Sequence, residues 1–231
     1  MNKIICAGVD AHPNRDINAH REIAQQWKNA NSKAEQQRIA REHGIRWSPL
    51  LNLPYFDIVR FSSIDPMHNL YLGTAKRMVE YNWLPNSELS FNAATQAGME
   101  KLVKMTRIPN DYGRVASKIA SNFSGLTANQ WKNWTLIHST FVLRDILPFE
   151  HRRCWQHFVD AVSRLTQWTI TLDQATEAHN SLVAFVQQVE ELYGRDAVTP
   201  NMHLHLHLFE CIIDYGPIPA WWCYPYERFN G

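Results

Sequence analysis

SIDPMHNLYLGTAKRMV, residues 63–79, is the stretch of the sequence that decides the fold class. Aspartate before proline is the signal for a helix N-cap followed by the first helical position, since aspartate accepts backbone N–H bonds and proline needs no donor there. Behind this cap, apolar residues recur at helical spacing: Leu70, Ala75, Met78 and Val79. The segment therefore predicts a helix over about residues 66–81.

Cap and stop signals of the same kind predict further helices on both sides of this segment. Two come before it, over residues 16–29 and 32–44, the second opening on a capping box. Those after it are expected over residues 90–106, 127–145 with a Thr127 cap, 148–171 opening on Pro148, 173–193 from an Asp173 cap, and from Thr199 to just before Gly216. At most a short strand is expected near 58–64. The predicted fold class is mainly α.

Composition sets limits on the class of protein. The 231 residues are 45% hydrophobic and 12% aromatic, which is enough to build a core, and the net charge is only +1. No apolar run is long enough to span a membrane, and the four cysteines form no CxxC pair. We expect a soluble intracellular protein with reduced thiols and no membrane partner.

Basic residues are concentrated in the middle of the chain. Residues 100–164 hold an excess of lysine and arginine over aspartate and glutamate, and this stretch is a candidate surface for nucleic-acid phosphates. The alternative is a solvated helix face. The candidate DNA-binding residues are Lys101, Lys104, Arg107, Arg114 and Lys118.

Alternating histidines mark the segment MHLHLHL, residues 202–208. In a helix that begins at Thr199, His203 and His207 lie one turn apart on one face, and such a pair supplies two of the four ligands of a tetrahedral zinc site. His205 points to the opposite side. The alternative is a set of half-buried histidines bonded to the backbone.

His68 is a further candidate for chemistry, whereas the position of Glu227 needs no functional explanation. His68, in the first turn after the Asp65 cap, faces the region where helix N-termini bind anions, so it is placed to touch a phosphate. Glu227 lies at the start of a predicted helix, where the helix dipole favours a carboxylate. Capping and dipole effects alone also account for Asp65 and Glu227.

Several motifs together resemble the transposase domain of CACTA-type DNA transposons of the fungal kind. They are LPYFD (53–57), DPMHN (65–69) with GTAK (73–76), QWKNW (130–134), TPNMHLHLHL (199–208) and YERFNG (226–231). This family is in turn distantly similar to the catalytic core of the V(D)J recombinase, an RNase H-like fold interrupted by a helical, zinc-binding insertion. The resemblance implies a partial transposase domain: a polar helical entry and irregular segment (1–64), the helical insertion (65–198), and the histidine-pair helix with the start of the catalytic-glutamate helix (199–231).

The resemblance also implies a chemistry. In such enzymes two aspartates and one glutamate hold two Mg²⁺ ions for cutting and joining DNA. Glu227 matches the glutamate, His203 and His207 match the zinc pair, and His68 matches a histidine near the scissile phosphate. The implied partners are transposon-end DNA and further copies of the chain, and the implied location is the nucleus.

The two catalytic aspartates and the CxxC pair that completes the zinc site lie upstream in the family, and none of Asp10, Asp16 or Asp57 stands in a matching context. We therefore expect a fragment, incomplete at both ends and inactive alone, whose complete form is a DDE transposase. A domesticated helical module that binds DNA or protein without catalysis is the alternative. A zinc hydrolase centred on the histidine pair is disfavoured because no HExxH motif accompanies it.

Overall fold

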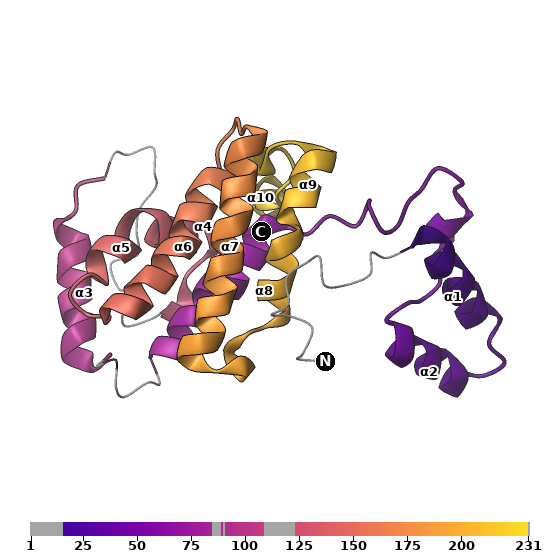
Figure 1. The fold of residues 1–231 in the computed structure, drawn as a ribbon, viewed down its shortest axis with the longest axis horizontal. Helices are drawn as coiled ribbons and strands as arrows, with labels where there is room; N and C mark the ends of the chain where they lie inside the picture. The colour runs from indigo at the N-terminus through magenta and orange to yellow at the C-terminus, as the bar shows by residue number, and fades with distance from the viewer. Residues whose placement is uncertain (1–15, 85–88, 90, 109–122, 231) are drawn as a thin grey trace. The chain divides into compact units, whose positions relative to one another are not determined.

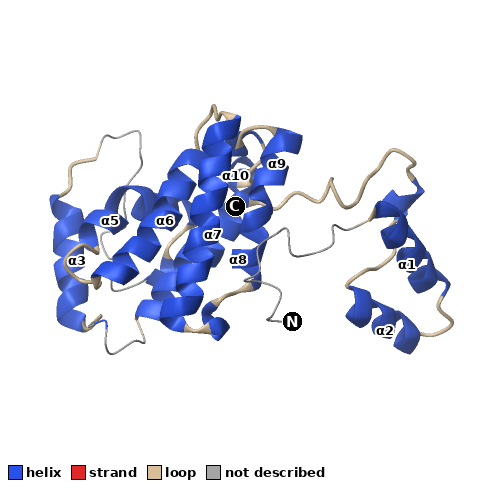
Figure 2. Cartoon of the chain, in the orientation of Figure 1, coloured by secondary structure: helices blue, strands red, loops and turns tan. Residues whose placement is uncertain are grey.

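The computed structural model describes residues 16–84, 89, 91–108 and 123–230, with side chains as far as Glu227. Every regular element in these ranges is helical, as Figure 2 shows, so the predicted mainly α class is confirmed. The described residues divide into two compact units, one ending at Ser63 and the other beginning at Ile64. No helix among them is long and apolar enough to cross a membrane.

The smaller unit is built on two helices whose ends follow the sequence signals. The Asp16 side chain caps α1 (Ile17–Asn29), and the Ser32 side chain caps α2 (Lys33–His43). Gly44 ends α2 at a φ of 68°, a left-handed conformation that favours glycine. Both helices therefore begin and end where the sequence predicts.

Two details of this unit refine the sequence prediction. The capping box of α2 is half formed, because the Glu35 carboxylate binds the Arg38 guanidinium instead of reaching back to the cap. Residues 58–64, where at most a short strand was expected, form no strand. The Asp57 carboxylate accepts two backbone N–H bonds from the residues that follow it, and this Asx-type arrangement turns the chain.

In the larger unit two long helices pack side by side at the centre, α6 (Phe149–Leu165) and α7 (Leu172–Tyr193) (Figure 1). The shorter α-helices flank them: α3 (Ala93–Met105), α4 (Ala128–Asn133) and α5 (Ser139–Val142) in the first half, then α8 (Pro200–Leu204), α9 (Leu208–Tyr215) and α10 (Tyr224–Asn230). Short 3-10 turns lie between some of them: η8 (Phe123–Gly125), η10 (Arg195–Ala197), η11 (His205–His207) and η12 (Ile218–Ala220).

The boundary between the two long helices corrects the sequence prediction. The first was expected to run to residue 171, but α6 ends at Leu165. Thr171 then caps α7 in a capping box with Gln174, in place of the expected cap at Asp173. A threonine hydroxyl with glutamine three residues later satisfies two backbone donors at once, which outcompetes a lone aspartate in the first turn.

The helix predicted over 66–81 is present but wound more widely than an α-helix. It consists of two π-helical stretches, η4 (Met67–Ala75) and η5 (Met78–Trp83). A third, η9 (Trp134–His138), interrupts the helix predicted over 127–145. The apolar residues used for the prediction are all buried: Leu70, Ala75, Met78 and Val79. The predicted buried face of this helix was therefore correct, and only its π-helical winding was not predicted.

Four tryptophans, which we call the tryptophan cluster, form the centre of the core: Trp83, Trp131, Trp134 and Trp155. Their rings meet in edge-to-face or tilted pairs, with centroids 5.0 Å apart for Trp83 and Trp155 and 5.8 Å for Trp134 and Trp155. They come from η5, α4, η9 and α6, so one contact set joins segments far apart in the chain. Trp155 Nε1 donates to Ser139 Oγ at 2.8 Å, and Trp83 Nε1 donates to the Tyr193 hydroxyl at 2.8 Å.

A close backbone approach joins η4 to α8 at Gly73. A Cβ added to Gly73 would lie 2.4 Å from Asn201 Nδ2 and 2.9 Å from the His68 carbonyl oxygen. Asn69 Nδ2 donates to the Asn201 carbonyl oxygen at 2.9 Å across the same contact. The Asn201 side chain therefore occupies the space that a Cβ of residue 73 would need, and a larger residue at this position would displace it.

The tryptophan cluster yields a stability prediction. Trp155→Ala should lower the free energy of unfolding by about 3–5 kcal/mol, because it removes a fully enclosed indole and leaves a cavity. The matched control is Trp168→Ala, which removes the same group from a side chain that is 76% exposed and should change stability by less than about 0.5 kcal/mol. Urea unfolding followed by circular dichroism measures both. Equal losses would contradict the central role of the cluster.

Candidate functional site

The Asp65 carboxylate joins the start of η4 to the C-terminal segment. Oδ1 and Oδ2 accept the backbone N–H groups of Met67 and His68 at 3.3 and 3.0 Å, as expected of a helix cap. Oδ1 also accepts the backbone N–H of Cys223 at 2.8 Å, although the two residues are 158 positions apart in the chain. Asp65 therefore fixes the segment that leads into α10 against the first turn of η4.

This contact brings together two residues that the sequence analysis singled out separately. His68 Nδ1 lies 2.5 Å from Asp65 Oδ2, and His68 Nε2 lies 3.4 Å from Glu227 Oε1 on α10. The side chains of His68 and Glu227 are 53% and 59% exposed, while Asp65 is 18% exposed. We call these three residues the carboxylate–histidine cluster. The His68 imidazole and the Glu227 carboxylate in this cluster are exposed to solvent, whereas the Asp65 carboxylate is mostly buried.

The arrangement sets the chemistry of the imidazole. Asp65 Oδ2 faces Nδ1 of the ring and Glu227 Oε1 faces Nε2, so each ring nitrogen has a carboxylate oxygen as its neighbour. Carboxylates on both sides of an imidazole favour a positive charge between them. His68 and Glu227 are thus arranged to share a proton or a cation.

The electrostatics of Asp65 favour its charged form. Burial acts to raise the pKa of this carboxyl, but the backbone N–H groups of His68 and Cys223, the His68 ring and the Met67 N–H outweigh burial, so the pKa is lowered below its usual value. The opposite holds for its neighbour Cys223. Burial, followed by the Asp65 and Glu227 carboxylates, raises the pKa of the Cys223 thiol and so favours its protonated form.

The histidine pair forms a second arrangement, on α8 and η11. His203 and His207 lie on one face, with their Nε2 atoms 3.3 Å apart. Two nitrogens bound to one tetrahedral zinc at the usual bond length lie about 3.3 Å apart. His207 Nδ1 is 3.5 Å from Glu210 Oε2, and this carboxylate orients the ring. Burial acts to raise the pKa of Glu210, but the bond with His207 outweighs it and the pKa is lowered.

His205 lies on the other side of the same turn, as the sequence predicts. It is fully buried, its Nδ1 is 3.5 Å from Thr74 Oγ1, and its ring packs beside Phe158 and Phe185. Burial, with smaller effects of nearby histidines, lowers the pKa of His205 to about 3. The side chain is therefore a neutral core residue.

Neither arrangement makes a complete metal site from the part of the chain that the structure describes. In those residues no group of three or more histidine, cysteine, aspartate and glutamate side chains is placed to hold an ion. Mg²⁺ requires an octahedron of oxygen ligands, and the carboxylate–histidine cluster offers one carboxylate that is not already bonded to backbone N–H groups. These side chains alone do not fit a pair of Mg²⁺ ions.

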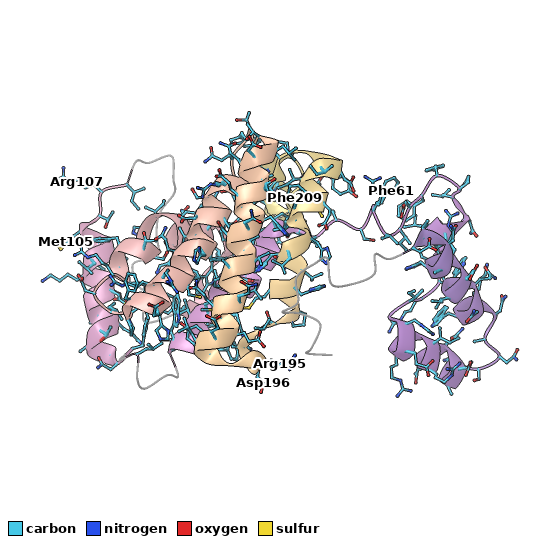
Figure 3. All side chains as sticks on the ribbon, viewed as in Figure 1. Phe61, Met105, Arg107, Arg195, Asp196 and Phe209 are labelled. Carbon is cyan, nitrogen blue, oxygen red and sulfur yellow. The ribbon has the colours of Figure 1, made fainter. Side chains whose placement is uncertain are left out.

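The basic candidates are only partly described. Lys101 and Lys104 are exposed in the last turns of α3, and Arg107 is exposed just beyond its end, where Figure 3 shows its side chain pointing outward beside Met105. Arg114 and Lys118 lie outside the described residues. The three described residues form a positively charged end to α3.

Sequence reasoning assigned Asp65 only a capping role and gave Cys223 none. The three-residue spacing between Asp65 and His68 was a usable signal, since a cap and a side chain in the first turn point the same way. The bond from the Cys223 backbone had no sequence signal, because it depends on packing between distant segments.

Comparison with known proteins gives no relative on which a role could be assigned. No family model matches the chain, no curated protein matches it, and no solved structure matches it.

The pKa of Asp65 leads to a prediction on pH. Because the folded pKa lies below the unfolded value, ionised Asp65 stabilises the fold fully above about pH 4, and this contribution disappears as the pH falls through the folded pKa. Asp65→Asn should therefore lower the free energy of unfolding by roughly 1–2 kcal/mol at pH 7 and flatten its fall between about pH 5 and pH 2. Urea unfolding across this range measures both effects.

Asp173→Asn is the matched control, since Asp173 is an exposed aspartate in the first turn of α7. It should leave the pH profile of the wild type nearly unchanged. The same flattening in both variants would show that the charge of Asp65 has no special role.

Proposed function

We propose that this chain is part of a DDE-type DNA transposase of the CACTA kind. The complete enzyme cuts and joins DNA by two-metal phosphoryl transfer on an RNase H-like core, and this chain alone is inactive. Its partner is then transposon-end DNA in the nucleus. The single observation that carries the proposal is the 3.4 Å approach of His68 Nε2 to Glu227 Oε1.

That approach supports the proposal because the two residues belong to two motifs of the transposase pattern that lie far apart in the chain. DPMHN contributes His68 and YERFNG contributes Glu227. The fold holds them next to each other through the Asp65 bond to the Cys223 backbone.

In this proposal the side chains have distinct roles. Glu227 supplies one carboxylate of a metal-binding set whose other members lie outside the described residues, so no step of the reaction is assigned to this chain alone. His68 is a positioning residue for the phosphate, and Asp65 orients its ring. His203 and His207 supply half of a structural zinc site, with Glu210 behind His207.

One observation favours a second function, a helical module that binds DNA without catalysis. The exposed cations at the end of α3, Lys101, Lys104 and Arg107, need no metal and no carboxylate set to contact phosphates. In that case the carboxylate–histidine cluster would be structural.

Mn²⁺ provides the test. It accepts both imidazole and carboxylate ligands, so it should bind weakly between His68 and Glu227 and broaden the NMR signals of the His68 ring. Supercoiled plasmid incubated with the same protein and Mg²⁺ or Mn²⁺ should remain uncut, because one carboxylate cannot hold the paired metals. Glu227→Gln should abolish the broadening.

Glu177→Gln is the control, because it removes an exposed carboxylate on α7 that faces no described histidine in an ion pair. It should leave the broadening of His68 intact. Broadening that survives Glu227→Gln would refute the proposed role of the glutamate. Plasmid cleavage that disappears in Glu227→Gln would show that the chain is active alone.

The histidine pair should bind Zn²⁺ several orders of magnitude more weakly than a four-ligand site, since it supplies only two ligands. Isothermal titration should show His203→Ala removing this binding. His43→Ala, on an exposed histidine at the end of α2, should not change it. Tight stoichiometric binding that survives loss of both His203 and His207 would refute the zinc assignment.

A further inference from the structure

A cavity of about 370 Å³ lies between α5 and the first turns of α6, apart from both histidine arrangements. Three arginines line it together with apolar side chains, and none of its lining residues is acidic. We call it the arginine pocket; its main lining residues are Leu143, Arg144, Phe149, Arg152, Arg153 and Trp155. Its volume falls in the range of small-ligand sites and suits one nucleotide.

Two of these arginines are held by weak partners that a ligand can replace. Arg144 pairs with Asp145 at 3.1 Å, and Arg153 pairs with Glu150 at 2.9 Å. All four side chains are more than half exposed, and exposed pairs of this kind contribute little to stability. Neither carboxylate lines the pocket. A phosphate in the pocket could therefore bind the Arg144 and Arg153 guanidinium groups, because breaking their present ion pairs costs little free energy.

The third arginine, Arg152, has a nitrogen without a hydrogen-bond partner in the described ranges of the chain. Arg152 Nε is enclosed and has no hydrogen-bond acceptor among the described residues. The Arg152 charge contributes to the lowered pKa of Asp145, but less than the bond from Arg144 does, and Asp145 is largely exposed. Because Nε itself is covered, a phosphate in the pocket would bind the terminal guanidinium nitrogens of Arg152, which are not among the enclosed atoms without a partner.

An aromatic surface lies beside these charges. The Phe149 side chain is 64% exposed although it opens a long helix, and the Arg152 guanidinium carbon lies 5.9 Å from the centre of its ring. Trp155 closes the floor of the pocket and is buried. An exposed ring next to guanidinium groups is the combination on which proteins stack the bases of single strands.

We propose that the arginine pocket binds one nucleotide unit of a single-stranded nucleic acid. The phosphate contacts Arg144, Arg152 and Arg153, and the base stacks on Phe149. A phosphopeptide would use the arginines but would leave the Phe149 ring without a planar partner. The biological meaning of the site rests on the proposed function, since a transposase handles exposed DNA strands.

Fluorescence anisotropy with a labelled twelve-residue oligothymidylate and the full chain tests the proposal. Arg152→Gln should weaken binding about tenfold and reduce the slope of log affinity against log salt by about 0.7, the value for one phosphate contact on a single strand. Phe149→Ala should also weaken binding, by roughly five- to a hundredfold, without changing that slope. The two variants thus separate phosphate contact from stacking.

Arg164→Gln is the matched control, because it removes one arginine from the opposite end of the same helix. It should leave both affinity and slope nearly unchanged. Circular dichroism should show all variants folded, since Phe149 is exposed and glutamine keeps a donor at position 152.

Equal losses in Arg152→Gln and Arg164→Gln would overturn the site. So would a phosphoserine peptide of equal charge that displaces the oligonucleotide while Phe149→Ala has no effect, since this would indicate a peptide site. The two proposals can fail separately. Loss of the oligonucleotide site would not change the Mn²⁺ binding at His68 and Glu227, and the absence of Mn²⁺ binding would not change the effect of Arg152→Gln on oligonucleotide affinity.

Discussion

Burial of the tryptophan cluster is the constraint on which the larger unit depends. By area, each buried indole contributes about 4–6 kcal/mol. Trp131 Nε1 and Trp134 Nε1 are enclosed without an acceptor among the described residues, at a cost of about 1–3 kcal/mol each. Burial of the rings outweighs that loss. Two of the four rings lie on π-helical stretches, since η5 ends on Trp83 and η9 begins on Trp134, whereas Trp131 and Trp155 lie on α-helices.

The two histidine arrangements share one design although they lie on different helices. In each, a carboxylate faces Nδ1 of an imidazole and leaves Nε2 opposite another electron-pair donor. The partner of His68 is the Glu227 carboxylate, which suits a proton or a hard cation. The partner of His207 is the second imidazole of His203, which suits zinc. The difference in donor type separates a candidate reaction site from a candidate structural site.

Local signals in the sequence predicted most of the helix boundaries, but they did not predict how every helix is wound. The caps at Asp16, Thr127 and Thr199 are correct because each depends on residues within one turn. The Thr171 capping box that begins α7 is also local but was not predicted, and no sequence signal marked the π-helical stretches. The candidate site divides in the same way. The placement of His203 and His207 on one face follows from their spacing, whereas the contact of His68 with Glu227 was not predicted, because it depends on packing between distant segments.

The glycine contact between η4 and α8 also connects the two histidine arrangements. The Asn201 side chain fills the space above Gly73, and Asn69 Nδ2 donates to the Asn201 carbonyl oxygen. His68 is on the first helix and His203 is on the second. The spacing between the backbones of His68 and His203 therefore depends on one glycine and two asparagines, none of which belongs to either arrangement.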